Sequence, residues 1–227
     1  ELRRTTLIER LISSIDIVKM NKINLSNLKK LHSEFLRVYE LYNKYLAENG
    51  FIDYADMLIK TRDILLNDPN ARNRCLQKYK YIFIDEYQDV DPIQAEIIGL
   101  FRGNGFVCVV GDDDQAIYQF RGADERNIQV FSQSQDCVNA PLSENRRCPQ
   151  NILSISENDI QKVSQRLTKS MYTNIGLGLV NVKQFPDLGT EISYIVDTIK
   201  DLLSSKEVTS LGQIGILLRS TSSYGSI

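Results

Sequence analysis

The stretch that most limits what this chain can fold into runs from Tyr81 to Asp91 and reads YIFIDEYQDVD. Four apolar or aromatic residues stand side by side at positions 81–84 and are followed directly by Asp85 and Glu86. A short unbroken apolar run of this kind predicts a strand that is buried on both faces, as in a parallel sheet. The carboxylate pair would then lie beyond the carboxyl end of the strand, where open α/β sheets bind their ligands.

A carboxylate pair in that position is what nucleotide hydrolysis uses. One carboxylate holds Mg²⁺, and the other orients or deprotonates the attacking water. The other interpretation of Asp85 and Glu86 is a charged corner between a strand and a loop. The polar side chains that follow at positions 88, 89 and 91 favour a site, because they carry more donors and acceptors than a turn needs.

The composition is that of an ordinary globular protein, with 227 residues of which 42% are hydrophobic and 25% charged. This length suffices for one large domain or two small ones. No apolar run is long enough to span a membrane, and the start of the chain does not resemble a signal peptide. The chain does not begin with Met, so we expect a piece of a longer protein.

Charge and cysteine content exclude several kinds of site. The net charge of −2 gives no general basic surface, so any nucleic-acid binding would be local, through base stacking and a few arginines. The four cysteines form no C-x-x-C pair, which argues against a zinc site and a disulfide framework and fits a reducing cytoplasm. The single histidine, His32, lies in a helical pattern and is expected to have no catalytic task.

Apolar residues recur at helical spacing from residue 1 to about 66. Ser26 is a candidate N-cap for a second helix, and Gly50 is a candidate stop just past its end. A third helix is expected from about Tyr54 to Leu66, ending before Asp68 and Pro69.

From Tyr81 onward the pattern alternates between strands and helices, which predicts a mostly parallel sheet. A domain boundary is expected between about 145 and 178. The expected strands are residues 81–84, 106–110, 138–142, 179–185 and 214–218, and the expected helices are 92–101, 149–165 and 191–203.

A second motif, GDDDQAIYQFRGAD, follows the strand expected at 106–110, so it should lie beside the acid pair. Gln115 can donate to a phosphate oxygen or hold the attacking water. Tyr118 and Phe120 with Arg121 suit stacking on unpaired bases. Composition alone favours the alternative that both aromatic residues belong to the core and Arg121 to the surface. The three aspartates lack the spacing of a calcium loop.

A third motif, LSENRRCPQNIL, places Arg146 and Arg147 between an expected strand and an expected helix. The planar guanidinium group matches the geometry of phosphate oxygens, so this position suits phosphate recognition. A solvated basic turn is the other interpretation of this segment.

Together these three segments resemble the motifs of the UvrD/Rep/PcrA-type superfamily 1 DNA helicases, in the right order and at sensible spacing. The first is similar to the Walker B motif of the family, the second to its third helicase motif and the third to its fourth. GFIDYADMLIKTRDIL and QRLTKSMYTN also resemble family segments, so the similarity covers roughly residues 35 to 220.

The resemblance implies an α/β fold with a RecA-like parallel sheet of the P-loop NTPase type and an added helical region. Residues 1–66 would be a helical segment inserted in or flanking the first motor domain. Residues 67–150 would be the later part of the first RecA-like domain. Residues 151–227 would be a linker and the start of the second RecA-like domain.

The resemblance also implies a role for each matching residue, with ATP and Mg²⁺ as cofactors and single-stranded or duplex DNA as partner. Asp85 would hold Mg²⁺, Glu86 would be the catalytic base and Gln115 would sense the γ-phosphate. Tyr118 and Phe120 would stack on single-stranded bases, and Arg121 would link the DNA and nucleotide motifs. Arg147 would contact the γ-phosphate, and Arg146 stands at the position that contacts the adenine.

Two departures from the family pattern stand out. Relatives usually carry a tyrosine where Arg146 stands, and stack it on the adenine base. No G-x-x-x-x-G-K-[ST] loop occurs anywhere in the chain, so the phosphate-cradling loop is missing from it. We therefore expect an internal fragment that has negligible ATPase activity by itself, because positioning the phosphates is most of the catalysis.

The leading expectation is a piece of a cytoplasmic, ATP-driven DNA helicase that moves 3′ to 5′, with no membrane association. The motor part of a helicase–nuclease and a non-hydrolysing module that binds single-stranded DNA or a protein remain open. A metal nuclease built on Asp85, Glu86 and Asp112 is a further alternative, although no ligand spacing supports it.

Overall fold

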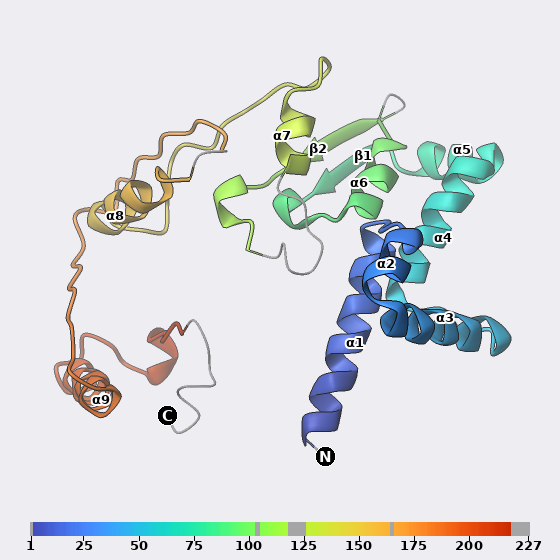
Figure 1. Cartoon of the computed structure of the whole chain (residues 1–227). Coiled ribbons are helices and arrows are strands. Elements are labelled where there is room, and N and C mark those ends of the chain that lie inside the picture. Colours follow the sequence, from blue (N-terminus) through green and yellow to red (C-terminus); the bar gives the residue numbers. More distant parts are fainter. Residues whose placement is uncertain (1, 103–104, 118–125, 164–165, 219–227) are drawn as a thin grey trace.

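The structure, a computed structural model, describes residues 2–102, 105–117, 126–163 and 166–218 (Figure 1). It is a mixed α/β arrangement with many helices and one small parallel sheet. The α-helices are α1 (Leu2–Met20), α2 (Leu25–Leu31), α3 (Ser33–Glu48), α4 (Tyr54–Asn67), α5 (Pro69–Lys78), α6 (Pro92–Gly99), α7 (Arg126–Ser132), α8 (Gln150–Ile160) and α9 (Leu188–Ser204). The strands are β1 (Tyr81–Ile84) and β2 (Phe106–Val109), and the short 3-10 helices are η1 (Tyr87–Asp89), η2 (Asp113–Gln115) and η4 (Leu211–Gln213).

The N-terminal region is helical, as its periodicity predicts, but its internal boundaries differ from the expected ones. The N-cap is Asn24, whose side chain accepts a hydrogen bond from the backbone N–H of Ser26 at 2.9 Å, so the assignment of Ser26 was wrong. The expected second helix is divided at His32 into α2 and α3. Gly50 has a φ of 67° and ends α3, as predicted, since a left-handed residue lets the N–H of Phe51 bond to the carbonyl of Leu46.

Helix α4 forms where it was expected, and a buried ion pair ties it to α1. Asp53 and Asp56 make a capping box at its N-terminus. Lys19 from α1 lies 2.7 Å from Asp53 Oδ2 and 2.8 Å from Asp56 Oδ1. The next helix, α5, was not predicted, because Asp68 and Pro69 were interpreted only as a stop. They also start α5, with Asp68 as its N-cap.

The two strands pair in parallel, with Tyr81 opposite Phe106 and Ile84 opposite Val109. Alternate residues therefore face opposite sides of the sheet. Ile84 and Val109 pack against a core cluster of Tyr87, Val90 and Ile128, to which α6 and α7 also contribute. This side of the sheet holds the core and supports the loops that follow both strands.

The other side of the sheet is open in the described part of the chain, so the prediction of a strand buried on both faces was wrong. Tyr81 is 70% exposed and Phe83 71%, and both rings pack against Phe106 with centroids about 6 Å apart. The reason is that α6 and α7 both contribute to the core on the side of Ile84 and Val109. Apolarity alone does not reveal whether a second layer is present.

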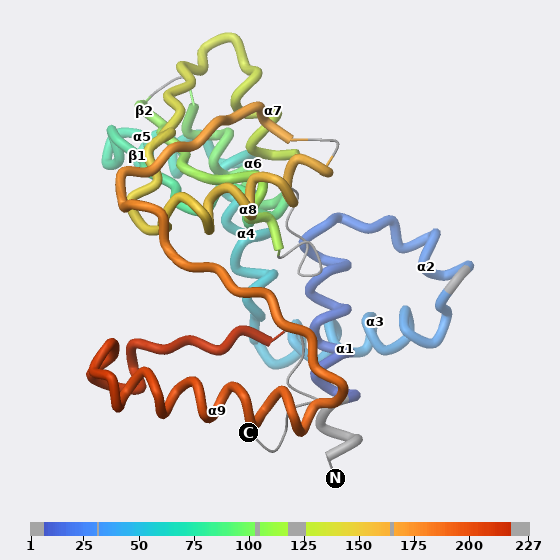
Figure 2. Tube along the Cα trace, turned by 90° about the vertical axis from the view of Figure 1, so that its left-hand side faces the viewer, coloured from blue at the N-terminus to red at the C-terminus, as the bar shows by residue number. Residues whose placement is uncertain are grey.

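Three further predicted strands are absent from the described residues, and the segments at 138–142, 179–185 and 214–218 run without ladder partners. A strand needs a hydrogen-bonded neighbour, and these segments have none there. Their apolar side chains lie in solvent accordingly: Val138 is 92% exposed, Val182 92% and Leu217 98%. Two views show the chain crossing from α8 to α9 as an extended connection (Figure 1, Figure 2).

Helix α9 confirms the helix expected at 191–203, whereas α8 ends at Ile160, earlier than expected. Helix α7 was not predicted, because its short sequence lacks a distinct apolar period. No helix of the described residues combines the length and the apolar character needed to cross a membrane.

Candidate active site

The loops that leave β1 and β2 lie side by side. Beyond the strand ends, the N–H of Val110 donates to the carbonyl of Ile84 at 2.8 Å, and the N–H of Tyr87 donates to the carbonyl of Val110 at 2.9 Å. These bonds bring the Asp85–Glu86 pair next to Gly111. A Cβ on Gly111 would lie 2.7 Å from Gln88 Oε1 and 3.1 Å from Tyr87 N, so a larger residue there would force the side chain of Gln88 to shift.

Glu86 stands in the left-handed backbone region, with φ 51° and ψ 44°, at the start of η1. A residue other than glycine seldom adopts this conformation, and strain of this kind concentrates at functional sites. The side chain of Asp85 accepts the N–H of Glu86 at 3.0 Å, which stabilises the sharp turn out of β1. Both acidic residues are exposed, and neither is in an ion pair with another described residue.

Both carboxylates border a hollow of about 450 Å³ between the exit of β1 and helices α4 and α6. Asp89 lines the same hollow, and its Oδ1 atom is buried without a hydrogen-bond partner among the described residues. Burial raises the pKa of Asp89, and the neighbouring Glu86 raises it further. Asp89 thus offers an unsatisfied carboxylate oxygen, the kind of ligand that a hard cation such as Mg²⁺ takes, although Asp85, Glu86 and Asp89 do not converge into one close cluster among the described residues.

Asp91, the last acidic residue of the motif, has a structural task. It is buried, and its Oδ1 accepts the N–H groups of Ile93 at 2.8 Å and Gln94 at 2.9 Å. It is thus the N-cap of α6, with Pro92 in the first turn. Burial raises the pKa of Asp91, although these hydrogen bonds oppose the shift.

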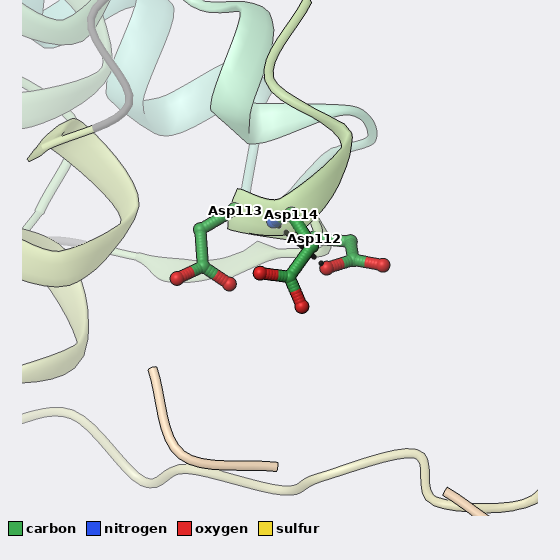
Figure 3. Close-up of side chains that lie close together, drawn as sticks. All are labelled: Asp112, Asp113 and Asp114. Carbon is green, nitrogen blue, oxygen red and sulfur yellow. Dashed lines mark hydrogen bonds between the residues drawn. The ribbon is translucent and has the colours of Figure 1, made fainter. Parts of the chain in front are cut away.

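Three carboxylates in a row follow β2, and they project to one side of the short helix η2 (Figure 3). Asp112 caps η2 by accepting the N–H of Asp114 at 3.1 Å, the dashed line in Figure 3. Its other oxygen accepts the side-chain amide of Gln115 at 2.7 Å. Asp112 therefore determines where the amide group of Gln115 lies.

The three carboxylates are paired with two basic residues from a distant part of the chain. Lys169 Nζ contacts Asp112, lies 2.6 Å from Asp113 Oδ1 and lies 2.8 Å from Asp114 Oδ2. Arg166 holds Asp114 with two further hydrogen bonds. The three aspartates lie close enough together to hold a metal ion. In the described structure, the positive charge beside them comes from Lys169 and Arg166.

These ion pairs shift the pKa values of the cluster. Burial by itself would raise the pKa of Asp112, but Lys169 and Gln115 outweigh burial and hold the pKa below its usual range. The pKa of Asp114 is lowered in the same way, by Arg166 and Lys169 against burial. For Lys169, burial favours the neutral amine, yet the three carboxylates raise its pKa. Asp112, Asp114 and Lys169 are therefore charged at neutral pH.

A continuous line of hydrogen bonds joins Gln115 to Glu86. Gln88, which is 1% exposed, donates its amide to Glu86 Oε2 at 2.7 Å and accepts the backbone N–H of Asp112 at 3.0 Å. Asp112 in turn holds Gln115. Sequence reasoning treated Gln88 only as part of a polar run, because nothing local distinguishes its burial.

The arginines of the third motif do not join this group in the described structure. Asn145 shapes the segment by accepting the N–H groups of Arg147 at 3.0 Å and Cys148 at 2.8 Å. Arg146 pairs with its neighbour Glu144, and its side chain is 83% exposed. Arg147 is exposed, and no described contact connects either arginine to Asp85, Glu86 or Gln115. Tyr118, Phe120 and Arg121 lie outside the described residues.

The fold and site define a mixed α/β protein with an acid pair and a glutamine at the carboxyl edge of two parallel strands. The family model for the UvrD/REP helicase N-terminal domain matches residues 2–136, and the chain belongs to this family. This confirms the resemblance drawn from the three motifs.

Curated relatives agree with this assignment. The chain is 35% identical to DNA helicase II of Haemophilus influenzae over 141 residues, which is 62% of this chain and 19% of that protein. It is 30% identical to ATP-dependent DNA helicase UvrD1 of Mycobacterium tuberculosis over 200 residues, 84% of this chain and 26% of the relative. A similar match, 30% over 164 residues, covers 70% of this chain and 24% of ATP-dependent DNA helicase Rep of Buchnera aphidicola. The chain thus spans 19% to 26% of the length of these relatives.

Proposed function

We propose that this chain is part of an ATP-dependent DNA helicase that couples ATP hydrolysis to movement along single-stranded DNA and to duplex unwinding. Family membership supports the helicase role. The single observation that carries the ATPase role is the hydrogen-bonded line from Glu86 to Gln115 across two neighbouring strand exits. It brings a carboxylate and an amide to one sheet edge, beside a hollow that could receive phosphates.

In this proposal the fold is RecA-like. Residues 1–66 belong to a helical part of the first motor domain, residues 67–150 to the later part of that domain, and residues 151–227 to a linker and the start of the second. The exposed apolar face of β1 and β2 supports a larger sheet or a further layer in the complete protein. Movement is proposed to run 3′ to 5′ along the strand. Comparing the unwinding of duplexes that carry a 3′ single-stranded tail with that of duplexes that carry a 5′ tail tests this direction.

Each site residue has a proposed task in hydrolysis. Asp85 holds Mg²⁺, which when bound neutralises charge on the phosphates. Glu86 accepts the proton of the attacking water, and its exposed carboxylate is in no ion pair with another described residue. Gln115 orients the water or the γ-phosphate through its amide. Arg147 and Arg146 contact the phosphates and the adenine after the two motor domains close.

The test is the substitution Glu86→Gln in the complete gene product, because the isolated chain lacks the phosphate-cradling loop. Removing a general base lowers turnover by about 100-fold or more, so DNA-stimulated ATP hydrolysis should fall by that factor while ATP still binds. The matched control is Glu48→Gln, at an exposed glutamate near the end of α3. Equal ATP turnover in wild type and Glu86→Gln would refute the role of Glu86. A wild-type protein that binds single-stranded DNA without hydrolysing ATP would instead be a binding module.

A further inference from the structure

Gln88 is the most deeply buried polar side chain of the site. It is 1% exposed, and both ends of its amide group are occupied. The amide nitrogen donates to a carboxylate oxygen of Glu86, and the amide oxygen accepts a backbone N–H from Asp112. The reverse orientation would place N–H against N–H and oxygen against oxygen, so the two partners define which way the amide lies.

The partners of Gln88 belong to different strands and to different halves of the proposed site. Glu86 follows β1, and Asp112 follows β2. Asp112 also accepts the side-chain amide of Gln115. The absence of a side chain at Gly111 gives Gln88 the room to reach the second loop, because a Cβ there would lie 2.7 Å from its oxygen.

We propose that Gln88 is a positioning residue that holds the carboxylate of Glu86 in register with the loop that carries Gln115. The inference rests on the proposed ATPase function and adds a residue to it. A neutral amide suits this task, since it orients the carboxylate by a hydrogen bond without placing a cation beside a proton acceptor. A shift of the Gln115 loop is transmitted to Glu86 through one rigid, buried side chain.

Burial makes both hydrogen bonds of Gln88 necessary. A buried polar group that loses its partner costs free energy, so Gln88 keeps both bonds or moves away from both. Tyr87, the first residue of η1, and Val90, its C-cap, belong to the apolar core cluster. Gln88 therefore has no competing polar partner among its described contacts, and its two bonds connect only the two loops.

The kinetic test compares Gln88→Met with wild type in the complete gene product. Methionine has a similar volume but cannot hold either partner, so kcat for ATP should fall about 10- to 100-fold. The Kd for ADP with Mg²⁺ should change less than about threefold, since Gln88 itself does not touch the nucleotide in the proposal. The control is Ile93→Val, which removes one methylene from a fully buried position in α6. An equal loss of kcat in the control, or none in Gln88→Met, overturns the inference.

Gln88→Glu separates positioning from simple loss of packing. The new side chain has the same length and can still accept the N–H of Asp112, but its carboxylate cannot donate to the carboxylate of Glu86 and repels it. The kcat for ATP should therefore fall at least as far in Gln88→Glu as in Gln88→Met, although the contact with Asp112 is kept. A wild-type kcat in Gln88→Glu contradicts the proposal.

Hydrogen exchange provides a measurement that needs no nucleotide. In Gln88→Met the backbone N–H of Asp112 loses its acceptor, so its exchange should accelerate about 10-fold or more. In Gln88→Glu and in Ile93→Val this amide should stay protected. Unchanged protection in Gln88→Met would overturn the inference and leave the proposed function standing. An inactive wild-type protein would overturn both.

Discussion

Arg166 holds Asp114 with two parallel hydrogen bonds, from Nε to Oδ1 at 2.9 Å and from Nη2 to Oδ2 at 2.6 Å, although 52 residues separate them in the sequence. Bidentate pairs of this kind define orientation as well as contact. Nearby, the N–H of Leu167 donates to Asp113 at 2.6 Å, and the Leu167 side chain packs on the core below the sheet. The segment after α8 is thus attached to the loop that carries Gln115.

Substitution of Lys169 should destabilise this attachment. Lys169→Met leaves three neighbouring carboxylates with less compensating charge, and breaking a buried ion pair in this way costs about 3–5 kcal/mol. Since the Lys169 side chain is 20% exposed, solvent reduces the expected loss of unfolding free energy to about 2–3 kcal/mol. Denaturant unfolding of wild type and Lys169→Met measures this loss of unfolding free energy. Lys44→Met, which breaks a surface pair with a 68% exposed lysine, should cost at most about 0.5 kcal/mol. Similar losses in the two variants would contradict the prediction.

The same cluster predicts how stability depends on pH. The pKa values of Asp112 and Asp114 are lower in the folded state than their ordinary value of 3.8, so their stabilising contribution is present above pH 3.8. It is lost as the pH falls below 3.8 through the folded-state values, because the unfolded chain then binds more protons. Urea unfolding at several pH values between about 2 and 7 should show a smaller acid-side decrease in Lys169→Met than in wild type. The raised pKa of Asp91 acts in the opposite direction but is common to both proteins. If the unfolding free energies of wild type and Lys169→Met fell equally on acidification, the ion pairs of Lys169 would not be the cause of the decrease.

The left-handed backbone of Glu86 makes a prediction that is independent of catalysis. At φ 51° glycine avoids the Cβ clash, so Glu86→Gly should be more stable than Glu86→Ala by about 1 kcal/mol. Both variants lose the bond to Gln88, and comparing them cancels its effect. At Glu40, an exposed position in the middle of α3, the order should reverse, with glycine about 0.5–1 kcal/mol less stable than alanine. Thermal or denaturant unfolding measures both differences. If Glu86→Ala were as stable as Glu86→Gly or more stable, the backbone at Glu86 would not be strained.

The aromatic pair of the second motif is expected to bind DNA. Replacing Tyr118 and Phe120 with alanine in the complete protein should weaken single-stranded DNA binding, at about 1–3 kcal/mol per stacked base. Stimulation of ATP turnover by DNA should be lost as well. Fluorescence anisotropy with an oligothymidylate measures the affinity, and Tyr54→Ala, at a tyrosine that is 87% exposed, is the control. If DNA affinity stayed unchanged and stability fell, Tyr118 and Phe120 would have to be assigned to the core and not to DNA binding.

Local chemistry made much of this fold predictable. Both strands of the sheet form where their apolar runs indicate. Gly50 ends α3 as predicted, because its conformation and the hydrogen bonds around it involve only nearby residues. The acid pair and the Gln115 loop could be assigned to the same sheet edge, since parallel strands end together. The residues 138–142 were wrongly assigned as a strand, because a strand depends on a partner that the segment itself does not reveal.

The helical N-terminal region, the two parallel strands and the family could be read from the order of residues, because they follow from short-range periodicity and contiguous motifs. The burial of Gln88 between two loops and the pairing of the aspartates with Arg166 and Lys169 are visible only in three dimensions. Those contacts join residues far apart along the chain. Their energies depend on burial and distance, which no local pattern of residues encodes.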